Sequence, residues 1–221
     1  MKTAVLCCCT LRDEMILAES RVKSGYDFFF TEKNLHDFPD LLGQALQQML
    51  DDLKGYDRVL LGFGFCGNAV LNLKAGDFEL ILPRCDDCIS LLLGSFQRRK
   101  AIVEEHPSLF LTRGWIDGKK GAWDQYCRVS KRYDEETTQM VFQQMYDPFD
   151  QLVLLDTEAY DIDDVLEKSK ILADAFHLSH CILPAGTERL EQLLTGPWDN
   201  ELFITVLPGE HIRDCDLLSP Q

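Results

Sequence analysis

Cysteine is the residue type whose number and spacing most clearly suggest chemistry in this chain. The 221 residues include nine cysteines, among them the triplet Cys7-Cys8-Cys9, the pair Cys85 and Cys88, and Cys66 in a glycine-rich segment. An odd number with this spacing favours free thiols and metal ligands over a disulfide framework. Thiolates are preferred ligands of zinc and of iron–sulfur clusters. We therefore expect a zinc ion or a [4Fe-4S] cluster as cofactor.

Four cysteines are the candidate metal ligands: Cys8, Cys66, Cys88 and Cys85. Strand alternation sends Cys7 and Cys9 to one face and Cys8 to the other, so we select Cys8 from the triplet. The short Cys-x-x-Cys spacing lets Cys85 and Cys88 reach one centre. The isolated cysteines are expected to have packing roles instead; these are Cys127, Cys181 and Cys215.

The turn around Cys66 has the composition of a binding loop. Gly64 and Gly67 permit positive φ and a close approach of the backbone to a bound group, and we assign them, with Asn68, to cofactor binding. The segment also resembles a dinucleotide-binding turn in part, but it has no matching acidic residue at the required offset.

Three further side chains are candidate catalytic or substrate-binding groups: His36, Glu14 and Arg84. His36 lies at a helix entry, where it could be a fourth ligand or a proton donor. For His36 and Glu14 a solvated or capping role is an equally good interpretation.

Two other chemistries compete with metal binding. Cys85 and Cys88 open a predicted helix, whose dipole would lower a thiol pKa and suit thiol–disulfide exchange. Cys66, in a turn between a strand and a helical pattern, could be the nucleophile of a hydrolase, although no base is identifiable.

The elements that position these residues alternate between strand and helix, which predicts an α/β fold of mostly parallel sheets covered by helices, in two Rossmann-like lobes. Strands are expected at 2–9, 26–30, 58–62, 78–82, 108–112, 151–155, 180–183 and 202–207. Helices are expected at 11–22, 35–53, 89–105 with a break at Gly94-Ser95, 133–146, 163–176 and 187–194, with a further helical stretch through Leu73.

The length fits one compact unit, residues 1–221, with a cysteine-rich lobe at 1–112 and a second α/β lobe at 113–221. Loops at the carboxyl ends of parallel strands gather at one edge of a sheet. The cysteines that end the strand at 2–9 and those that follow the strands at 58–62 and 78–82 should therefore meet there.

The charge balance excludes two classes of partner. With 22 basic and 37 acidic residues, the net charge of −15 repels nucleic acids and anionic membrane surfaces. The apolar runs are far shorter than the roughly 20 residues that span a bilayer. Because residues 2–9 fit a first strand better than a secretory signal, we expect a cytoplasmic protein.

Several motifs in a fixed order resemble the domain of unknown function 1638 family over residues 2–205. They are Cys8 with Glu14, Leu35-His36-Asp37, Gly64-Phe65-Cys66-Gly67-Asn68, Pro83-Arg84-Cys85-Asp86-Asp87-Cys88-Ile89, Leu93-Gly94-Ser95 and Gly114-Trp115. The resemblance implies a prokaryotic protein connected with corrinoid-dependent methyltransferase systems. It also implies a three-cysteine core, because other residues, histidine among them, often replace Cys85 in that family.

Three cysteines leave one coordination position open, which suits chemistry on a substrate. The first hypothesis is a metal-dependent enzyme, such as a transferase or lyase, acting on a small molecule in methyl, corrinoid or thiol metabolism. The second is an accessory or metallochaperone module for a corrinoid methyltransferase. A Cys-x-x-Cys thiol redox protein is the third.

Overall fold

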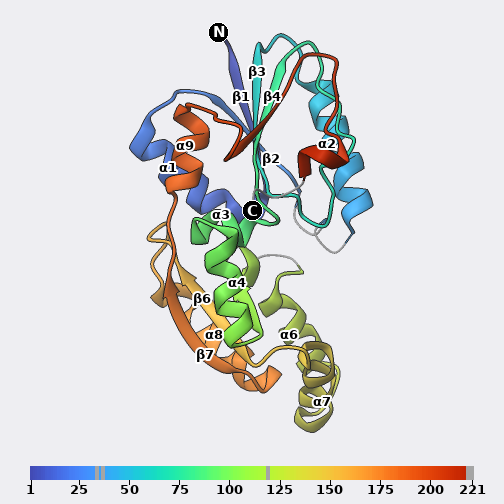
Figure 1. The fold of residues 1–221 in the computed structure, drawn as a ribbon. Helices are drawn as coiled ribbons and strands as arrows, with labels where there is room; N and C mark the ends of the chain where they lie inside the picture. Colours follow the sequence, from blue (N-terminus) through green and yellow to red (C-terminus); the bar gives the residue numbers. More distant parts are fainter. Residues whose placement is uncertain (33–34, 36–37, 118–119, 218–221) are drawn as a thin grey trace.

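The computed structural model describes residues 1–32, 35, 38–117 and 120–217, and it contains two β-sheets flanked by helices (Figure 1). The first sheet has the order β2-β1-β3-β4-β8, with β1 at Thr3–Cys7, β2 at Asp27–Phe30, β3 at Arg58–Gly62, β4 at Glu79–Pro83 and β8 at Phe203–Val206. The second has the order β5-β6-β7, with β5 at Ser108–Leu111, β6 at Gln151–Asp156 and β7 at Ser179–Pro184. The expected α/β class is confirmed.

The helices alternate with the strands along the chain. They are α1 (Arg12–Val22), α2 (Pro39–Asp52), α3 (Cys88–Leu93), α4 (Phe96–Glu105), α5 (Arg113–Ile116), α6 (Ala122–Ser130), α7 (Glu135–Tyr146), α8 (Asp163–Phe176) and α9 (Glu188–Thr195), with short 3-10 turns at Cys9–Leu11 and Asp214–Leu217. The predicted break at Gly94-Ser95 is confirmed, because Gly94 is left-handed and the Ser95 side chain caps α4.

The central strands of the first sheet, β1, β3 and β4, are almost entirely buried. β1 lies between β2 and β3, and all five of its residues are buried. Figure 1 shows α1 and α9 on one side of this sheet and α2 on the other. Such double cover explains why β1, β3 and β4 read as continuous apolar runs rather than as alternating patterns.

Sheet membership does not follow the lobe boundary expected after residue 112. β5 lies before that residue but pairs with β6 in the second sheet. β8 lies near the end of the chain but returns to the first sheet, where it pairs antiparallel with β4. The division of the chain into one unit or two lobes stays a prediction.

Two local expectations were wrong. The segment after β3 forms turns rather than a helix through Leu73, because Cys66, Gly67, Asn68 and Asn72 all have positive φ, which a right-handed helix excludes. The first strand ends at Cys7, so Cys9 lies in a 3-10 turn and not on the strand face assumed for it.

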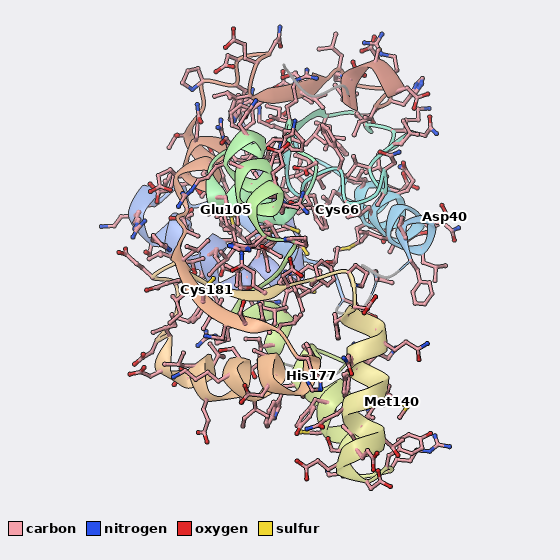
Figure 2. The ribbon with its side chains drawn as sticks, turned by 60° about the horizontal axis from the view of Figure 1, so that its bottom comes forward. Asp40, Cys66, Glu105, Met140, His177 and Cys181 are labelled. Atoms are coloured by element: carbon pink, nitrogen blue, oxygen red, sulfur yellow. The ribbon has the colours of Figure 1, made fainter. Side chains whose placement is uncertain are left out.

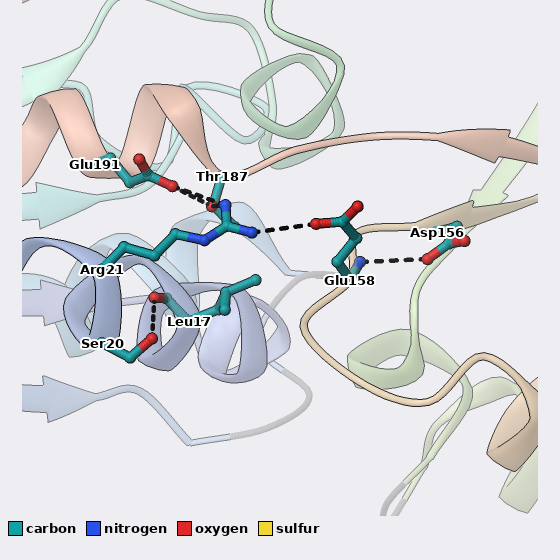
Figure 3. Close-up of polar contacts among 7 residues, drawn as sticks. All are labelled: Leu17, Ser20, Arg21, Asp156, Glu158, Thr187 and Glu191. Atoms are coloured by element: carbon teal, nitrogen blue, oxygen red, sulfur yellow. Dashed lines mark hydrogen bonds and ion pairs between the residues drawn. The ribbon is translucent and has the colours of Figure 1, made fainter.

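Polar contacts join the two sheets through α1 (Figure 3). The Arg21 guanidinium donates to Thr187 and Glu191 at the start of α9, both at 2.9 Å, and to Glu158, which follows β6, at 3.1 Å. On the same junction, a Cβ on Gly114 would overlap the carbonyl oxygen of Thr10. The loop after β1 therefore packs directly on α5. Within the described ranges, no helix is long and apolar enough to cross a membrane.

Candidate functional site

The candidate site lies where the winding of the first sheet changes direction. The order β2-β1-β3-β4 places the crossover to β2 on one side of β1 and the rest of the sheet on the other. In sheets of this kind the connections diverge at that point and leave a crevice at the carboxyl ends of the two central strands. Cys8 directly follows β1, and Cys66 lies in the loop after β3.

Cys66 has a backbone conformation that is unusual for its residue type. Its φ is 47°, and Gly67 and Asn68 follow with φ values of 66° and 68°. A left-handed conformation costs a residue with a Cβ roughly 1–2 kcal/mol, and such outliers occur preferentially at functional sites. This turn directs the half-buried Cys66 side chain toward the start of α3 instead of away from the sheet.

Backbone hydrogen bonds hold the Cys66 loop against the loop that follows β4. The amide of Phe65 donates to the Cys85 carbonyl and the amide of Cys66 to the Asp86 carbonyl, both at 2.8 Å. Gly64 makes this approach possible, since a Cβ there would lie 2.5 Å from the Asp87 Cα. The two cysteine-bearing loops are thus fixed to each other before any ligand binds.

The carboxylates beside Cys88 hold its loop in place. Asp87 caps α3, its side chain accepting from the Ser90 amide at 2.9 Å. Arg99 of α4 forms ion pairs with Asp86 at 2.9 Å and with Asp87 at 3.0 Å. Burial raises the pKa of Asp87, against the opposing effects of its Ser90 hydrogen bond and Arg99.

Three of the four predicted ligands come together. The Sγ atoms of Cys66 and Cys88 are 4.0 Å apart. Cys88 also interacts with the Cys8 thiol, and Cys8 contacts the Thr10 hydroxyl at 2.9 Å. The hydrogen bond to Cys66, together with burial, raises the pKa of Cys88, and burial raises that of Cys8. Both thiols are therefore neutral when no cation is present.

Cys85 turns away from this group. Its thiol donates to the Asp87 carbonyl at 3.5 Å, and it lies beside Arg84 and Leu202 in a separate surface depression. Burial raises its pKa, as do the neighbouring carboxylates of Asp87 and Asp86. The thiols of Cys66 and Cys88 are thus the pair that is close in space, although Cys85 and Cys88 are closer in sequence.

Of the remaining cysteines, Cys9 interacts with the Cys8 thiol. All nine cysteines lie within the described residues, and none of them is in a disulfide. The Cys7 thiol is fully buried and points to the carbonyls of Cys8 and Gly62. Cys181 is on β7 in the second sheet, and Figure 2 places it well apart from Cys66.

The two predicted catalytic groups that the structure describes, Arg84 and Glu14, bind elsewhere than at the thiols. Arg84 donates to the carbonyls of Asn200 and Asp216 and so anchors the C-terminal segment. Glu14 is completely buried at the junction with the second sheet, where it accepts from the Thr157 hydroxyl at 3.1 Å. Burial raises the pKa of Glu14 to about 7. His36 lies outside the described residues.

Thr10 and Arg99 are site residues that sequence reasoning missed. A threonine two residues after a candidate ligand is a local signal that could have indicated the Thr10 contact with Cys8. Arg99 carries no comparable signal, since only the packing of α4 brings it to Asp86 and Asp87.

The arrangement supplies soft sulfur donors from three loops. Across the described part of the chain, however, no group of three or more His, Cys, Asp and Glu side chains is already placed to hold a metal ion. The close pair fits a shared ion on its own. Two thiolates at 2.3 Å from a tetrahedral zinc stand about 3.8 Å apart, near the 4.0 Å between Cys66 and Cys88.

Comparison with known proteins gives one match. A family model described as a protein of unknown function, DUF1638, matches residues 30–194. Cys66, Cys85 and Cys88 lie inside this range, whereas Cys8 and Glu14 precede it. No curated protein matches the chain, and no solved structure does.

Proposed function

Because the chain belongs to the DUF1638 family, whose function is unknown, we propose a function from the geometry: a thiolate-ligated metal protein that acts on a small molecule in thiol or methyl metabolism. Cys8, Cys66 and Cys88 would hold the metal. The observation that carries this proposal is the meeting of three thiols from three different strand ends, one of them on a left-handed, strained backbone.

The spacing of the sulfurs favours a single zinc-like ion over an iron–sulfur cluster. Cys66 and Cys88 are 4.0 Å apart, as two ligands of one ion would be. Cysteines that bind a [4Fe-4S] cluster each ligate a different iron, so their sulfurs are separated by an additional iron–iron edge. A cluster would require the two fixed loops to move apart.

The cost of burying negative charge explains why the thiols would need a cation in order to ionise. Burial disfavours thiolates at Cys8 and Cys88, and a dication reverses that preference by stabilising them. When bound by three thiolates, zinc retains an open position that can activate a thiol or water. The chain's own contribution is to orient Cys8 through Thr10 and to hold Cys66 through the paired loops.

Metal and acid-labile sulfide analysis of protein purified without oxygen tests this proposal. We expect close to one zinc per chain and no sulfide. Cys66→Ser and Cys88→Ser should each lose the metal and keep the fold by circular dichroism, whereas Cys127→Ser, a half-buried cysteine on α6, should retain it. A finding of acid-labile sulfide with about four irons per chain would instead indicate an iron–sulfur cluster at this site. Absence of both metals in anaerobic protein would refute the proposal.

An accessory or metallochaperone role for a corrinoid methyltransferase is the second candidate, favoured by apolar side chains beside Cys66. Pro39 reaches Gly67, with a Cβ built on Gly67 lying 3.2 Å from the Pro39 Cγ. Next to Pro39, the side chains of Phe38 and Leu41 are 56% and 49% exposed. An exposed apolar rim suits a surface that docks a partner. Rapid transfer of bound zinc to a purified methyltransferase, faster than transfer to a chelator of equal affinity, would support delivery over catalysis.

A further inference from the structure

A cavity of about 390 Å³ lies between the second sheet and the carboxyl edge of the first. Its volume is within the roughly 300–1,000 Å³ typical of small-molecule sites. Residues from β5, α3, α4, α5, α6 and the end of α7 surround it, together with Thr10 after β1 and Asp87 after β4. A strand of the second sheet and loops at the carboxyl edge of the first sheet therefore both contribute to its walls.

The inner end of the cavity adjoins the candidate metal site. Thr10 lines the cavity, and its hydroxyl is 2.9 Å from the Cys8 Sγ. Asp87 also lines it, and the next residue is Cys88. Cys8 and Cys88 are themselves buried, so Thr10 and Asp87 separate the cavity from the two thiols.

Much of the remaining lining is apolar and rich in rings, and it includes Phe110, Leu111, Trp115, Tyr146 and Phe149. Aromatic walls favour a flat apolar group, which they contact by offset stacking or edge-on packing.

The two carboxylates in the lining already have partners of opposite sign. Asp87 is paired with Arg99 at 3.0 Å, and Asp117 with Lys168 at 2.6 Å. A neutral molecule can therefore enter without leaving either carboxylate buried and unpaired.

We propose that this cavity binds a small thiol with a flat apolar body, whose ring lies between Phe110 and Trp115 and whose sulfur approaches the metal past Thr10. The thiol end rests on the proposed function, since a zinc with three thiolate ligands has an open position for a soft donor. The binding of the apolar body rests on the cavity alone.

Benzenethiol and phenol are suitable probes, because they share a ring and differ in the donor atom. We measure their binding to the full chain by calorimetry under anaerobic conditions, with and without bound zinc. Both should bind the metal-free protein, and zinc should make benzenethiol bind at least about tenfold more tightly than phenol.

Ala122→Phe is the test variant, because Ala122 lines the cavity on α6 and a ring there fills it. The matched control is Arg128→Phe, which adds the same ring to an exposed position of the same helix. Ala122→Phe should weaken binding of both probes by about tenfold or more, and Arg128→Phe should not. In the wild-type chain, nuclear Overhauser contacts between the probe ring and the Trp115 indole locate the ligand without any variant.

The outcomes separate the two proposals. Failure of both probes to bind, equal binding to Ala122→Phe and wild type, or absence of contacts to Trp115 would overturn the cavity site. Equal affinities for the two probes in zinc-loaded protein would overturn the thiol assignment. Metal content, measured on the same samples, reports independently on the proposed function.

Discussion

Gly64→Ala tests whether the two cysteine loops must be in contact for the site to form. A Cβ on Gly64 would lie 2.5 Å from the Cα and carbonyl carbon of Asp87 and 2.8 Å from its nitrogen, whereas ordinary contact begins at 3.4 Å. These are backbone atoms, so no side chain can rotate away to make room. The loop carrying Cys88 would have to shift by about 1 Å, and overpacking of this kind costs about 1–3 kcal/mol.

That shift would change the position of the Cys88 thiol relative to the Cys66 thiol. The hydrogen bonds from the Phe65 and Cys66 amides hold Cys66 in register with the loop that leads to Cys88. We therefore expect Gly64→Ala to weaken zinc binding by about 10–100-fold, the range found when groups that orient metal ligands are altered. The free energy of unfolding of the metal-free chain should fall by about 1–3 kcal/mol.

Competition with a chromophoric chelator gives the zinc affinity, and urea unfolding of metal-free protein gives the stability. Gly186→Ala is the control, because the atoms that its Cβ would meet belong to the flexible carboxylate end of Glu188. Gly64→Ala with the zinc affinity and unfolding midpoint of the wild type would refute the argument that loop contact determines the site.

Two further perturbations test separate parts of the structure. Burial raises the folded-state pKa of Glu14 from 4.5 to about 7, so the folded state holds a proton that the unfolded chain has already lost, and stability should fall as pH rises between these values. Relative to Glu14→Gln, the free energy of unfolding of the wild type should fall by on the order of 3 kcal/mol across this pH window. Urea unfolding at about pH 5 and about pH 8 measures this difference. Parallel pH profiles for the two proteins would argue against a buried carboxyl with a raised pKa. In metal-free protein, mild oxidation with diamide should form a disulfide between Cys66 and Cys88, whose sulfurs are 4.0 Å apart, and peptide mass mapping should detect it. A Cys85–Cys88 disulfide instead would contradict the observed orientation of Cys85. Bound zinc should protect the wild type from forming either disulfide.

The sequence by itself determined many of the local elements and the loops that hold the candidate ligands. β3 and α8 have the bounds expected from their patterns, since a run of buried apolar residues or a helical periodicity is a local property. The choice of Cys8, Cys66, Cys85 and Cys88 as candidate ligands rested on strand alternation and on the rule that parallel strands end at one edge. That rule gathers loops, but it does not orient the side chains within them. The reduction to a three-cysteine core came from the family resemblance.

Only the tertiary structure decided which groups meet. The pairing of β8 with β4 and the contact of Thr157 with Glu14 join residues more than a hundred positions apart, and no periodicity encodes such partners. The left-handed turn at Cys66 replaces the helix expected after β3 and brings the Cys66 thiol to Cys88. Cys88 is therefore paired with Cys66 and not with Cys85. A backbone of positive φ at a cysteine is unfavourable on its own, and the contacts of the Cys66 loop with the neighbouring loop stabilise it.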